Sequence, residues 1–384
     1  MNATLEPTLA KYVERVRSAY ADGTALSLRG GGSKNFYGPP GEGAPLDTAE
    51  LRGILAYEPT ELVITAAAGT PLAELEAVLA EKGQCLAFEP PHFSWSSPTK
   101  SATVGGMVAS GLSGPARASV GGVRDYVLGL HLLNGRGELL QFGGQVMKNV
   151  AGYDVSRLLV GSMGTLGLIT QVSLKVLPQA PAESTLVFPV GPTQALQALH
   201  RWGGQPLPLS ASCWVHDPHA SGTGQDLLFV RLRGARAAVE AACKRMLSEV
   251  TGQRMDNAQA QPDWEHCRNQ TLAFFARPAP DLALWRLSVA QTAPALDVPW
   301  PQLMEWHGGL RWLWAPPEAA SQLQSIAQAY GGFAMQFVAA YAYSTGHGAT
   351  FDLKNTASAA IHRRIKNAMD PKGIFNPGRM PAHF

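Results

Sequence analysis

The sequence has few cysteines, no excess of charge of either sign and no long hydrophobic run. Its 384 residues include four cysteines, no two of which form a C-x-x-C pair, so local spacing builds neither a zinc site nor an iron–sulfur cluster. The 31 basic and 29 acidic residues give a formal charge of +2, which is too small for the electrostatic footprint of a nucleic-acid-binding protein. We therefore expect buried free thiols and no nucleic-acid partner.

Two further features are missing. No uninterrupted apolar run approaches the roughly 20 residues that a membrane-spanning helix needs. The N-terminal Met-Asn-Ala-Thr, followed by Glu6 and Pro7, lacks the basic and apolar regions of a secretory signal. The sequence thus predicts a soluble, cytoplasmic protein, long enough for two or three domains.

Glycine, in contrast, is plentiful, with 40 residues, and it recurs through residues 101–178. Residues 103–114 read T-V-G-G-M-V-A-S-G-L-S-G, and glycines return in 121–130 and 148–170. Glycine at such density brings main chain against something large and flat, and leaves backbone N–H groups free to donate. The pattern predicts a cofactor that carries phosphate.

A second glycine-rich stretch, R-G-G-G-S-K-N at 29–35, follows a short predicted strand at 25–28. Its three glycines can form a nest of N–H donors for a pyrophosphate, to which Ser33 adds a hydroxyl and Lys34 a charge. A flexible hairpin turn fits the same residues. The loop lacks a Walker A ending, and Asn35 stands where the Rossmann fingerprint has its third glycine, so a nicotinamide-type Rossmann domain is disfavoured.

Hydrophobic periodicity predicts alternating helices and strands in two regions. The first region is expected to hold an amphipathic helix ending at Asp22-Gly23, a strand at 61–68, a helix capped by Thr70-Pro71, a hairpin of strands 127–133 and 138–142, a short helix at 154–160 and a strand at 168–177. The second is expected to hold strands at 184–188, 211–216, 227–232, 282–289 and 310–314 and helices at 193–202, 235–250 and 318–330. This order suits an antiparallel sheet covered by helices.

Four tryptophans crowd one part of the second region: Trp300, Trp306, Trp312 and Trp314. Tryptophan is usually well buried, so a place in the core is one interpretation. An anchor surface for a partner subunit is the other.

A set of motifs in fixed order resembles a known family. R-G-G-G-S at 29–33, T-V-G-G-M-V-A-S at 103–110, R-D-Y-V-L-G at 124–129 and G-S-M-G-T-L-G-L-I-T at 161–170 resemble the FAD-binding domain of the vanillyl-alcohol oxidase/PCMH flavoprotein superfamily. D-P-K-G-I-F-N-P-G-R-M at 370–380 is similar to the segment with which its 2-hydroxyacid branch closes over the flavin. Within that branch, E-P-T-E-L-V-I-T-A-A-A-G-T-P-L at 58–72 and F-E-P-P-H at 88–92 look most like the FAD-binding E subunits of bacterial glycolate oxidases.

The resemblance implies an α+β fold. It would comprise a PCMH-type FAD-binding domain of two subdomains at 1–178, an antiparallel-sheet cap domain at 179–343 and a C-terminal segment at 344–384 that returns to the FAD domain. The motifs cover roughly residues 25–180 and 345–382, and the middle matches only in length and element order.

The resemblance also implies the cofactor site. The residues expected to bind FAD are Gly30, Gly31, Gly32, Ser33, Lys34, Pro91, Thr103, Val104, Gly105, Gly106, Ser110, Gly111, Gly114, Arg124, Asp125, Val127, Ile169 and Asn376. Backbone amides of the glycine-rich segments would bracket the pyrophosphate, and Arg124 and Asp125 would form an ion pair that aims a loop. Val127 and Ile169 would pack the ribose or adenine. Some members link FAD covalently through a histidine after the first glycines, and Ser33 in its place implies noncovalent FAD.

Catalytic relatives hold a divalent metal with paired histidines and a Glu-His-Gly segment. Here residues 344–348 read S-T-G-H-G with no glutamate, so His347 is expected to be a loop histidine or a flavin neighbour. The close pair His216 and His219 flanks Pro218, which prevents a regular helical turn. We therefore expect no metal site, and no catalytic residue is assigned.

The function that the resemblance implies is oxidation of glycolate to glyoxylate by a multisubunit, FAD-dependent dehydrogenase. The partners would be a paralogous FAD subunit and an iron–sulfur subunit, which could bring the cytoplasmic chain to the inner face of the membrane. Two alternatives remain open at this point. The chain could be a self-sufficient FAD-dependent 2-hydroxyacid dehydrogenase, or a non-catalytic assembly subunit stabilised by FAD.

Overall fold

The protein, seen in a computed structural model, is described over residues 6–96, 101–144, 154–218, 224–340 and 356–380. It divides into two compact units. The first comprises Met1–Leu112, Gly122–Pro178 and Thr350–Phe384, and the second comprises Ser113–Gly121 and Gln179–Ala349. The short segment Ser113–Gly121 thus packs with the second unit although it lies within the glycine-rich part of the sequence.

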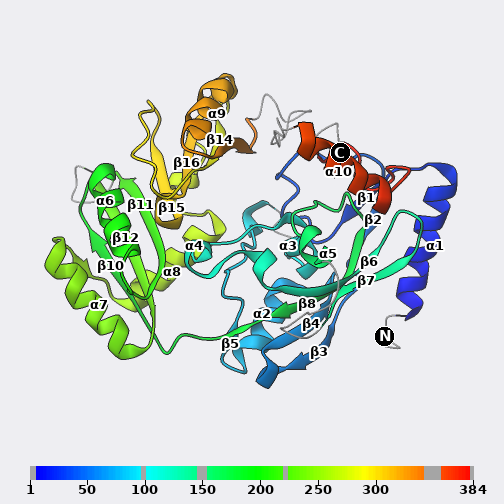
Figure 1. The fold of residues 1–384 in the computed structure, drawn as a ribbon, viewed down its shortest axis with the longest axis horizontal. Coiled ribbons are helices and arrows are strands. Elements are labelled where there is room, and N and C mark those ends of the chain that lie inside the picture. Colours follow the sequence, from blue (N-terminus) through cyan, green and yellow to red (C-terminus); the bar gives the residue numbers. More distant parts are fainter. Residues whose placement is uncertain (1–5, 97–100, 145–153, 219–223, 341–355, 381–384) are drawn as a thin grey trace. The chain divides into compact units, whose positions relative to one another are not determined.

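The first unit is built around a five-stranded antiparallel sheet of order β3-β4-β8-β6-β7 (Figure 1). Its elements are α1 (Glu6–Asp22), β1 (Leu26–Arg29), β2 (Ala44–Asp47), β3 (Ile54–Glu58), β4 (Val63–Ala67), α2 (Leu72–Ala80), β5 (Gln84–Cys85), α3 (Val104–Ser110), β6 (Val127–Leu133), β7 (Leu139–Gly143), α5 (Val155–Leu158), β8 (Leu168–Lys175), β9 (Leu177–Pro178) and α10 (Thr356–Met369). Strands β1 and β2 form a separate parallel pair, and β5 pairs with β9.

Two hydrophobic clusters hold the first unit together. The larger joins the sheet to α2 and α3 through side chains such as Ile64, Leu75 and Met107, each fully buried. The second joins α1 and β1 to the C-terminal segment through Val16, Leu26 and Phe375. Burying these side chains is the dominant stabilising term. The end of the chain is therefore part of the core of the first unit.

The second unit contains an eight-stranded antiparallel sheet of order β13-β10-β12-β11-β15-β16-β14-β17. Its elements are α4 (Arg117–Val120), β10 (Ala182–Phe188), α6 (Pro192–Gly203), β11 (Leu209–Asp217), β12 (Gln225–Gly234), α7 (Arg236–Glu249), β13 (Gln253–Arg254), α8 (Asn257–Asn269), β14 (Ala283–Ser288), β15 (Gln302–Glu305), β16 (Leu310–Ala315), α9 (Ala320–Ala329) and β17 (Phe333–Val338). Helices α6 and α7 share one core with β10, β11 and β12, and α9 shares another with β14 and β16.

The helices and strands predicted from periodicity are confirmed in type and order, with shifts of a few residues at their ends. The hairpin of β6 and β7 is one example, because Leu133 pairs with Leu139 across the predicted glycine turn. One detail of the prediction was wrong. Thr70 does not cap α2, since its hydroxyl donates to the carbonyl oxygen of Gly53 and accepts from the Gly53 N–H.

The core interpretation of the tryptophan group holds for three of its four members. Trp306, Trp312 and Trp314 are 6%, 3% and 6% exposed, and Trp300 is half-buried. All four cysteines are free thiols, and three are buried, whereas Cys85 is half-buried. Among the described residues, no helix has both the length and the apolarity needed to cross a bilayer.

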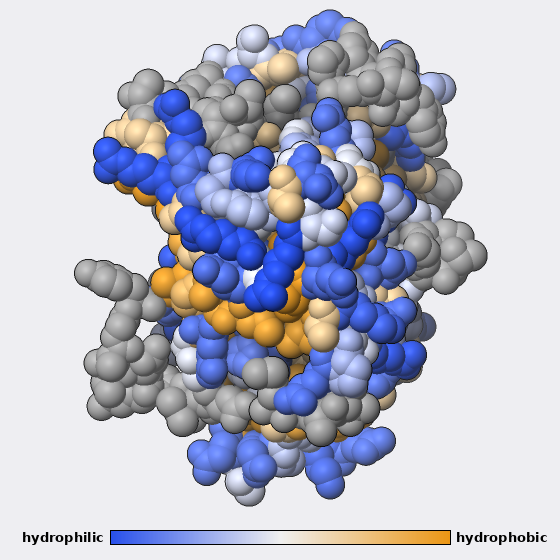
Figure 2. Space-filling model, turned by 90° about the vertical axis from the view of Figure 1, so that its right-hand side faces the viewer, coloured by the Kyte–Doolittle hydropathy of each residue, from blue (hydrophilic) through white to orange (hydrophobic). Residues whose placement is uncertain are grey.

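Figure 2 shows the face of the first unit that carries α1, where hydrophobic residues gather in a band bordered by hydrophilic ones. A shallow depression on this unit is lined by Leu9, Val13 and Leu139, with Glu14 and Arg17 beside them. Leu139, which begins β7, is 42% exposed, and Leu9 and Val13 of α1 are half-buried.

Candidate cofactor-binding site

The first unit contains a cavity of about 280 Å³ whose lining comes mainly from four segments. These are the loop after β1, the start of α3, residues 163–169 and the C-terminal segment around Asn376. The expected site residues that line it are Gly30, Gly31, Gly32, Ser33, Lys34, Thr103, Gly105, Gly106, Ser110, Ile169 and Asn376. The structure thus brings both glycine-rich stretches of the sequence to one place.

The loop of residues 30–34, which we call the glycine loop, presents unused donors. Within the described parts of the chain, the backbone N–H groups of Gly30, Gly31, Gly32 and Ser33 donate to no other group. Gly32 has a φ of +73°, which favours glycine. A row of free amides in a turn is a binding site for an anion such as a phosphate.

The loop also fits tightly against the segment before α3. A Cβ atom on Gly30 would lie 2.7 Å from Thr103 Oγ1, and one on Gly31 would lie 1.5 Å from the carbonyl oxygen of Ser101. Only glycine therefore fits at residue 31 without moving the backbone. The close packing fixes the orientation of the free N–H groups.

The second glycine-rich stretch forms helix α3 instead of an open loop. Its N-cap Thr103 accepts from the Gly106 N–H at 3.2 Å, and the N–H groups of Val104 and Gly105 donate to the carbonyl oxygens of Thr70 and Ala68. The expectation that the amides of Gly105 and Gly106 are free to bind pyrophosphate was therefore wrong, because the protein itself uses them. Their glycines still bring the helix close to the cavity and to Ala68.

Three cationic side chains, from Arg29, Lys34 and Arg379, line the cavity, and its described lining includes no carboxylate. Lys34 is 8% exposed and lies 5.7 Å from the ring centroid of Phe93. Arg379 donates to the carbonyl oxygens of Lys34 and Tyr37, and burial lowers its pKa. This excess of positive charge matches a ligand with two phosphate charges.

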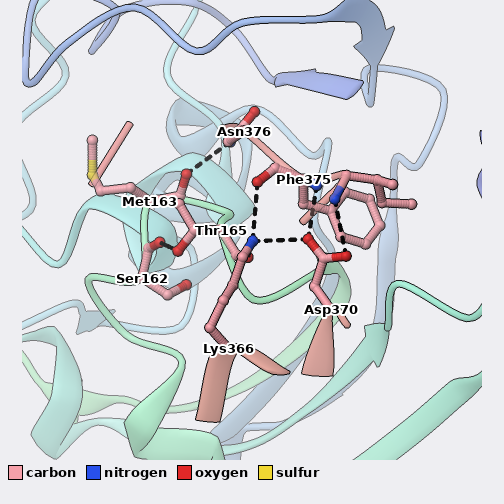
Figure 3. Close-up of polar contacts among 8 residues, drawn as sticks. Ser162, Met163, Thr165, Lys366, Asp370, Phe375 and Asn376 are labelled. Carbon is pink, nitrogen blue, oxygen red and sulfur yellow. Dashed lines mark hydrogen bonds and ion pairs between the residues drawn. The ribbon is translucent and has the colours of Figure 1, made fainter. Parts of the chain in front are cut away.

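Residues 366–376 form a buried polar clasp that holds the C-terminal segment in the first unit (Figure 3). Lys366 Nζ donates to Asp370 Oδ2 at 2.8 Å and to the carbonyl oxygens of Thr165 and Phe375. Asp370, which is 1% exposed, accepts from the N–H groups of Ile374 and Phe375. Each buried charge is thus paired and hydrogen-bonded, as burial requires.

Asn376 connects this clasp to the cavity. Its Nδ2 donates to the carbonyl oxygen of Met163 at 2.8 Å (Figure 3). Its side-chain Oδ1 accepts from the Leu28 N–H at 2.7 Å. Leu28 and Met163 both line the cavity, on segments far apart in the sequence. Asn376 therefore fixes the distance between two walls of the site.

Seven of the expected site residues do not line the cavity: Pro91, Val104, Gly111, Gly114, Arg124, Asp125 and Val127. Val104 and Val127 are core residues of the first unit, and Gly111 ends α3 with a φ of +65°. Gly114 belongs to the second unit, where its carbonyl oxygen accepts from Trp306 Nε1.

The expected ion pair of Arg124 and Asp125 is also absent, although both residues are described and exposed. Asp125 instead accepts from the N–H of Gly122 at 2.8 Å, which closes a short turn before β6. The Asp125 carboxylate is therefore used by the backbone of this turn and not by its sequence neighbour Arg124.

Several lining residues were missed by the sequence reasoning: Ser27, Leu28, Arg29, Asn35, Pro40, Gly41, Thr48, Ala68, Ala109, Met163, Gly164, Gly167, Leu168 and Arg379. Six of these fourteen lie one or two residues from a predicted position: Leu28, Arg29, Asn35, Ala109, Gly167 and Leu168. Arg379 could have been predicted, because it is a charged residue within the C-terminal motif at 370–380.

The structure describes one of the three histidines that the sequence analysis considered. His347 and His219 lie outside the described residues, and His216 Nδ1 is 2.8 Å from Asp226 Oδ1. Among the described residues, no three His, Cys, Asp or Glu side chains are grouped so that they could hold a metal ion.

A glycine loop with free amides, three cations and a closing C-terminal clasp define a protein that binds a phosphate-bearing cofactor. The family described as "FAD binding domain" matches residues 7–143. The fold is similar to alkyldihydroxyacetonephosphate synthase, with a TM-score of 0.64 and 18% identity over 96% of this chain and 74% of that chain. FAD therefore fits the site, and the fold is that of the PCMH-type FAD oxidases, as the sequence predicted.

The relatives narrow the class further. The chain is 43% identical to "Glycolate oxidase subunit GlcE" of Escherichia coli over 97% of both chains. It is 29% identical to "Glycolate oxidase subunit GlcD" of Bacillus subtilis over 48% of this chain and 39% of that one. It is 35% identical to a D-lactate dehydrogenase of Archaeoglobus fulgidus over 42% of this chain and 35% of that one. The chain belongs to the family of the glycolate oxidase subunit GlcE.

Proposed function

We propose that this chain is the FAD-binding subunit of a glycolate oxidase complex that oxidises glycolate to glyoxylate. The observation that carries the proposal is the 43% identity to GlcE along almost the whole of both chains. In this reaction glycolate loses two electrons and two protons. Bound FAD supplies the two-electron acceptor.

The residues that would hold FAD follow from the cavity. The free amides of residues 30–33 and the cations Arg29, Lys34 and Arg379 would take the pyrophosphate charges. Gly105, Gly106 and Ser110 would contribute the surface of α3, and Ile169 an apolar wall. Asn376 would hold the site closed. Ser33 offers no nitrogen for a histidine-type link, so FAD would be noncovalent.

We also propose the domain bounds 1–178, 179–343 and 344–384, in which the C-terminal segment completes the FAD domain, although residues 113–121 pack with the second unit. The hydrogen bond between Asn376 and Leu28 and the burial of Phe375 support this assignment. Three of the chain's four free cysteines are buried. Among the described residues, no three His, Cys, Asp or Glu side chains are grouped so that they could hold a metal ion. An iron–sulfur subunit would therefore carry the electrons away, and a GlcD-type FAD subunit would complete the complex.

The first test is the cofactor itself. We expect the purified chain to be yellow, and acid to release intact FAD into the supernatant. Flavin that stays with the denatured polypeptide would contradict noncovalent binding. A colourless protein that takes up no added FAD would contradict the site.

The second test separates the possible roles of the chain. Flavin bleaching by glycolate is followed anaerobically for the isolated chain and for the chain co-expressed with a GlcD-type and an iron–sulfur subunit. We expect bleaching of this chain's flavin in the complex and slower bleaching alone. Rapid turnover by the chain alone would show a self-sufficient dehydrogenase, and flavin that is never reduced in the complex would show an assembly subunit.

A further inference from the structure

The second unit carries a cluster of two arginines and two tryptophans, which we call the Arg–Trp cluster: Arg117, Arg286, Trp306 and Trp312. The guanidinium carbon of Arg286 lies 5.1 Å from the ring centroid of Trp306 and 6.0 Å from that of Trp312. The guanidinium carbon of Arg117 lies 4.5 Å from the Trp306 centroid. Two guanidinium groups that share one indole ring are thus no more than about 10 Å apart.

Arg286 lies on the face of the sheet opposite α6, α7 and α9, the face on which Cys267 of α8 contacts Glu305. Its neighbours Trp285 and Leu287 belong to the core under α9, and side chains alternate along a strand, so Arg286 points the other way. Trp312 is its direct partner on β16, and Met335 is its partner on β17. The guanidinium is half-buried in a setting of large apolar side chains.

The turn that positions Trp306 is strained. Trp306, His307 and Gly308 have φ values of 54°, 55° and 93°, so two side-chain-bearing residues in succession adopt the left-handed conformation. Such strain persists where surrounding contacts enforce it, and it gathers at functional sites. Here Trp306 Nε1 donates to the carbonyl oxygen of Gly114, and His307 bonds to Ser212 and Ser119. The fold therefore holds this indole beside the two guanidinium groups at a cost in backbone energy.

The positive charge of Arg286 has no carboxylate partner within the described chain, and its N–H groups donate to no described residue. Glu305, the buried carboxylate on the same face, is held by Trp312 Nε1 at 2.6 Å and by Cys267 Sγ at 3.3 Å. His307 adds no charge near neutral pH, since burial lowers its pKa to about 4. A guanidinium stacked on aromatic rings keeps its planar fork of donors available for a carboxylate.

We propose that the Arg–Trp cluster binds the carboxylate of a small 2-hydroxy monocarboxylic acid, with Arg286 as the main anchor and Arg117 as a second positive charge. The identity of the acid rests on the proposed function, whereas the anion site rests on the geometry of the second unit alone. The site would give this chain its own means of holding substrate, although the metal motif of its catalytic relatives is not expected here.

The test measures binding without turnover, on the full-length chain with its flavin oxidised. Glycolate is titrated by calorimetry and by tryptophan fluorescence, beside glycolamide, which has the same size but no charge. We expect glycolate to bind at least about tenfold more tightly than glycolamide, because a charge-assisted bidentate contact is lost with the amide. Arg286→Gln should weaken glycolate binding by about tenfold to a hundredfold.

Two variants make the result specific. Arg286→Lys keeps the charge but loses the planar fork, so we expect intermediate affinity. Arg236→Gln removes an exposed arginine at the start of α7 and should leave glycolate binding unchanged. Thermal melting and flavin content of each variant show whether it folds. Equal binding of glycolate and glycolamide, or wild-type affinity in a folded Arg286→Gln variant, would overturn the proposal.

Together with the activity of the complex, the same experiment distinguishes a failure of the anion-site proposal from a failure of the proposed function. If the complex fails to oxidise glycolate while the chain binds it in an Arg286-dependent way, the anion site stands and the glycolate oxidase assignment fails. If the complex oxidises glycolate while Arg286→Gln binds it normally, the assignment stands and the anion site is wrong.

Discussion

The two glycine-rich segments of the first unit look alike in the sequence but use their backbones differently. The glycine loop at 30–34 leaves four N–H groups without a partner among the described residues. The segment 103–110 forms a helix, and the N–H groups at its start donate to Ala68, Thr70 and its own N-cap Thr103. Glycine density therefore predicts a close approach of main chain, but it does not predict which amides are free.

The difference has a physical origin. Thr103, the first residue of the second segment, caps the helix and supplies a local acceptor, so a helix forms despite two glycines. The glycine loop begins where β1 ends, and it is positioned by distant contacts with Ser101 and Thr103. One segment is folded by its own sequence, whereas the other depends on its neighbours.

The largest expected effect comes from Gly31→Ala, which tests the close packing of the glycine loop. The new Cβ would lie 1.5 Å from the Ser101 carbonyl oxygen, so the loop backbone must move. Displacement of the free amides should lower FAD affinity by about a hundredfold, as roughly 3 kcal/mol of strain and lost contacts would produce. Flavin content and FAD titration of the apoprotein measure the loss.

Gly203→Ala is the matched control for this substitution. It lies at the end of α6, where an added Cβ meets nothing within 4 Å. It should leave FAD binding unchanged and stability equal or slightly higher. Full flavin occupancy in Gly31→Ala would show that the loop adapts without cost.

The next effect concerns α3, where substitutions at Gly105 and Gly106 form a matched pair. Comparing them separates the role of a glycine in packing from its role in contact with the cofactor. A Cβ on Gly105 would lie 2.7 Å from the Ala68 Cβ, whereas one on Gly106 would meet only Thr103 Oγ1 at 3.1 Å. Gly105→Ala should lower the free energy of unfolding by about 1–3 kcal/mol. Gly106→Ala should change it little, since helix propensity offsets the contact. Urea denaturation compares the two.

Substitution by valine, which has a larger side chain, tests whether a glycine of this segment contacts the cofactor. Gly106 lines the cavity, so Gly106→Val should reduce FAD binding more than it reduces stability. Gly111→Val should do the opposite, because Gly111 has a φ of +65° and lies against Gly161 outside the cavity. Equal losses of flavin and stability in both variants would argue against separate roles.

Much of the fold could be predicted because periodicity reports local preferences. The helix at Glu6–Asp22 and the hairpin of β6 and β7 are encoded by spacing and by a glycine turn. Strands β15 and β17 and helix α8 were missed. Helix α8 carries a weak signal because it contains Pro262 and few apolar positions. Tertiary packing, with Trp264 and Cys267 buried, overrides the weak local signal there.

The expected site residues line the cavity where a motif coincides with it, and they lie in the core where a motif serves packing. Residues 30–34 and Asn376 line the cavity, but Val104 and Val127 occupy the hydrophobic cluster beside it. A sequence motif records both kinds of residue without distinguishing them. Arg286 on β14 and Trp306 in the turn between β15 and β16 carried no local pattern that links them.

A smaller effect is expected from substitution of Asn376. Its side chain bonds to residues far away in the sequence, whereas Thr103 caps α3 through a local hydrogen bond. Asn376→Ala removes both side-chain bonds and leaves the Leu28 N–H without its acceptor. The free energy of unfolding should fall by about 1–3 kcal/mol. FAD dissociation should also be faster, because two cavity walls lose their link. Asn376→Asp keeps the acceptor for Leu28 but not the donor to Met163, so it should retain part of the stability.

The smallest effect, and the sharpest test of how the two segments depend on each other, is the coupling between residues 30 and 103. Gly30→Ala alone should be destabilising, since its Cβ would lie 2.7 Å from Thr103 Oγ1. Thr103→Ala alone should cost about 1 kcal/mol through the lost helix cap. In the double variant the clash disappears, so the combined loss should be smaller than the sum by about 0.5–1 kcal/mol. Thr103→Ser restores the cap but keeps an oxygen near residue 30, and therefore should not relieve Gly30→Ala. Strictly additive losses in urea denaturation would mean that the glycine loop is positioned without Thr103.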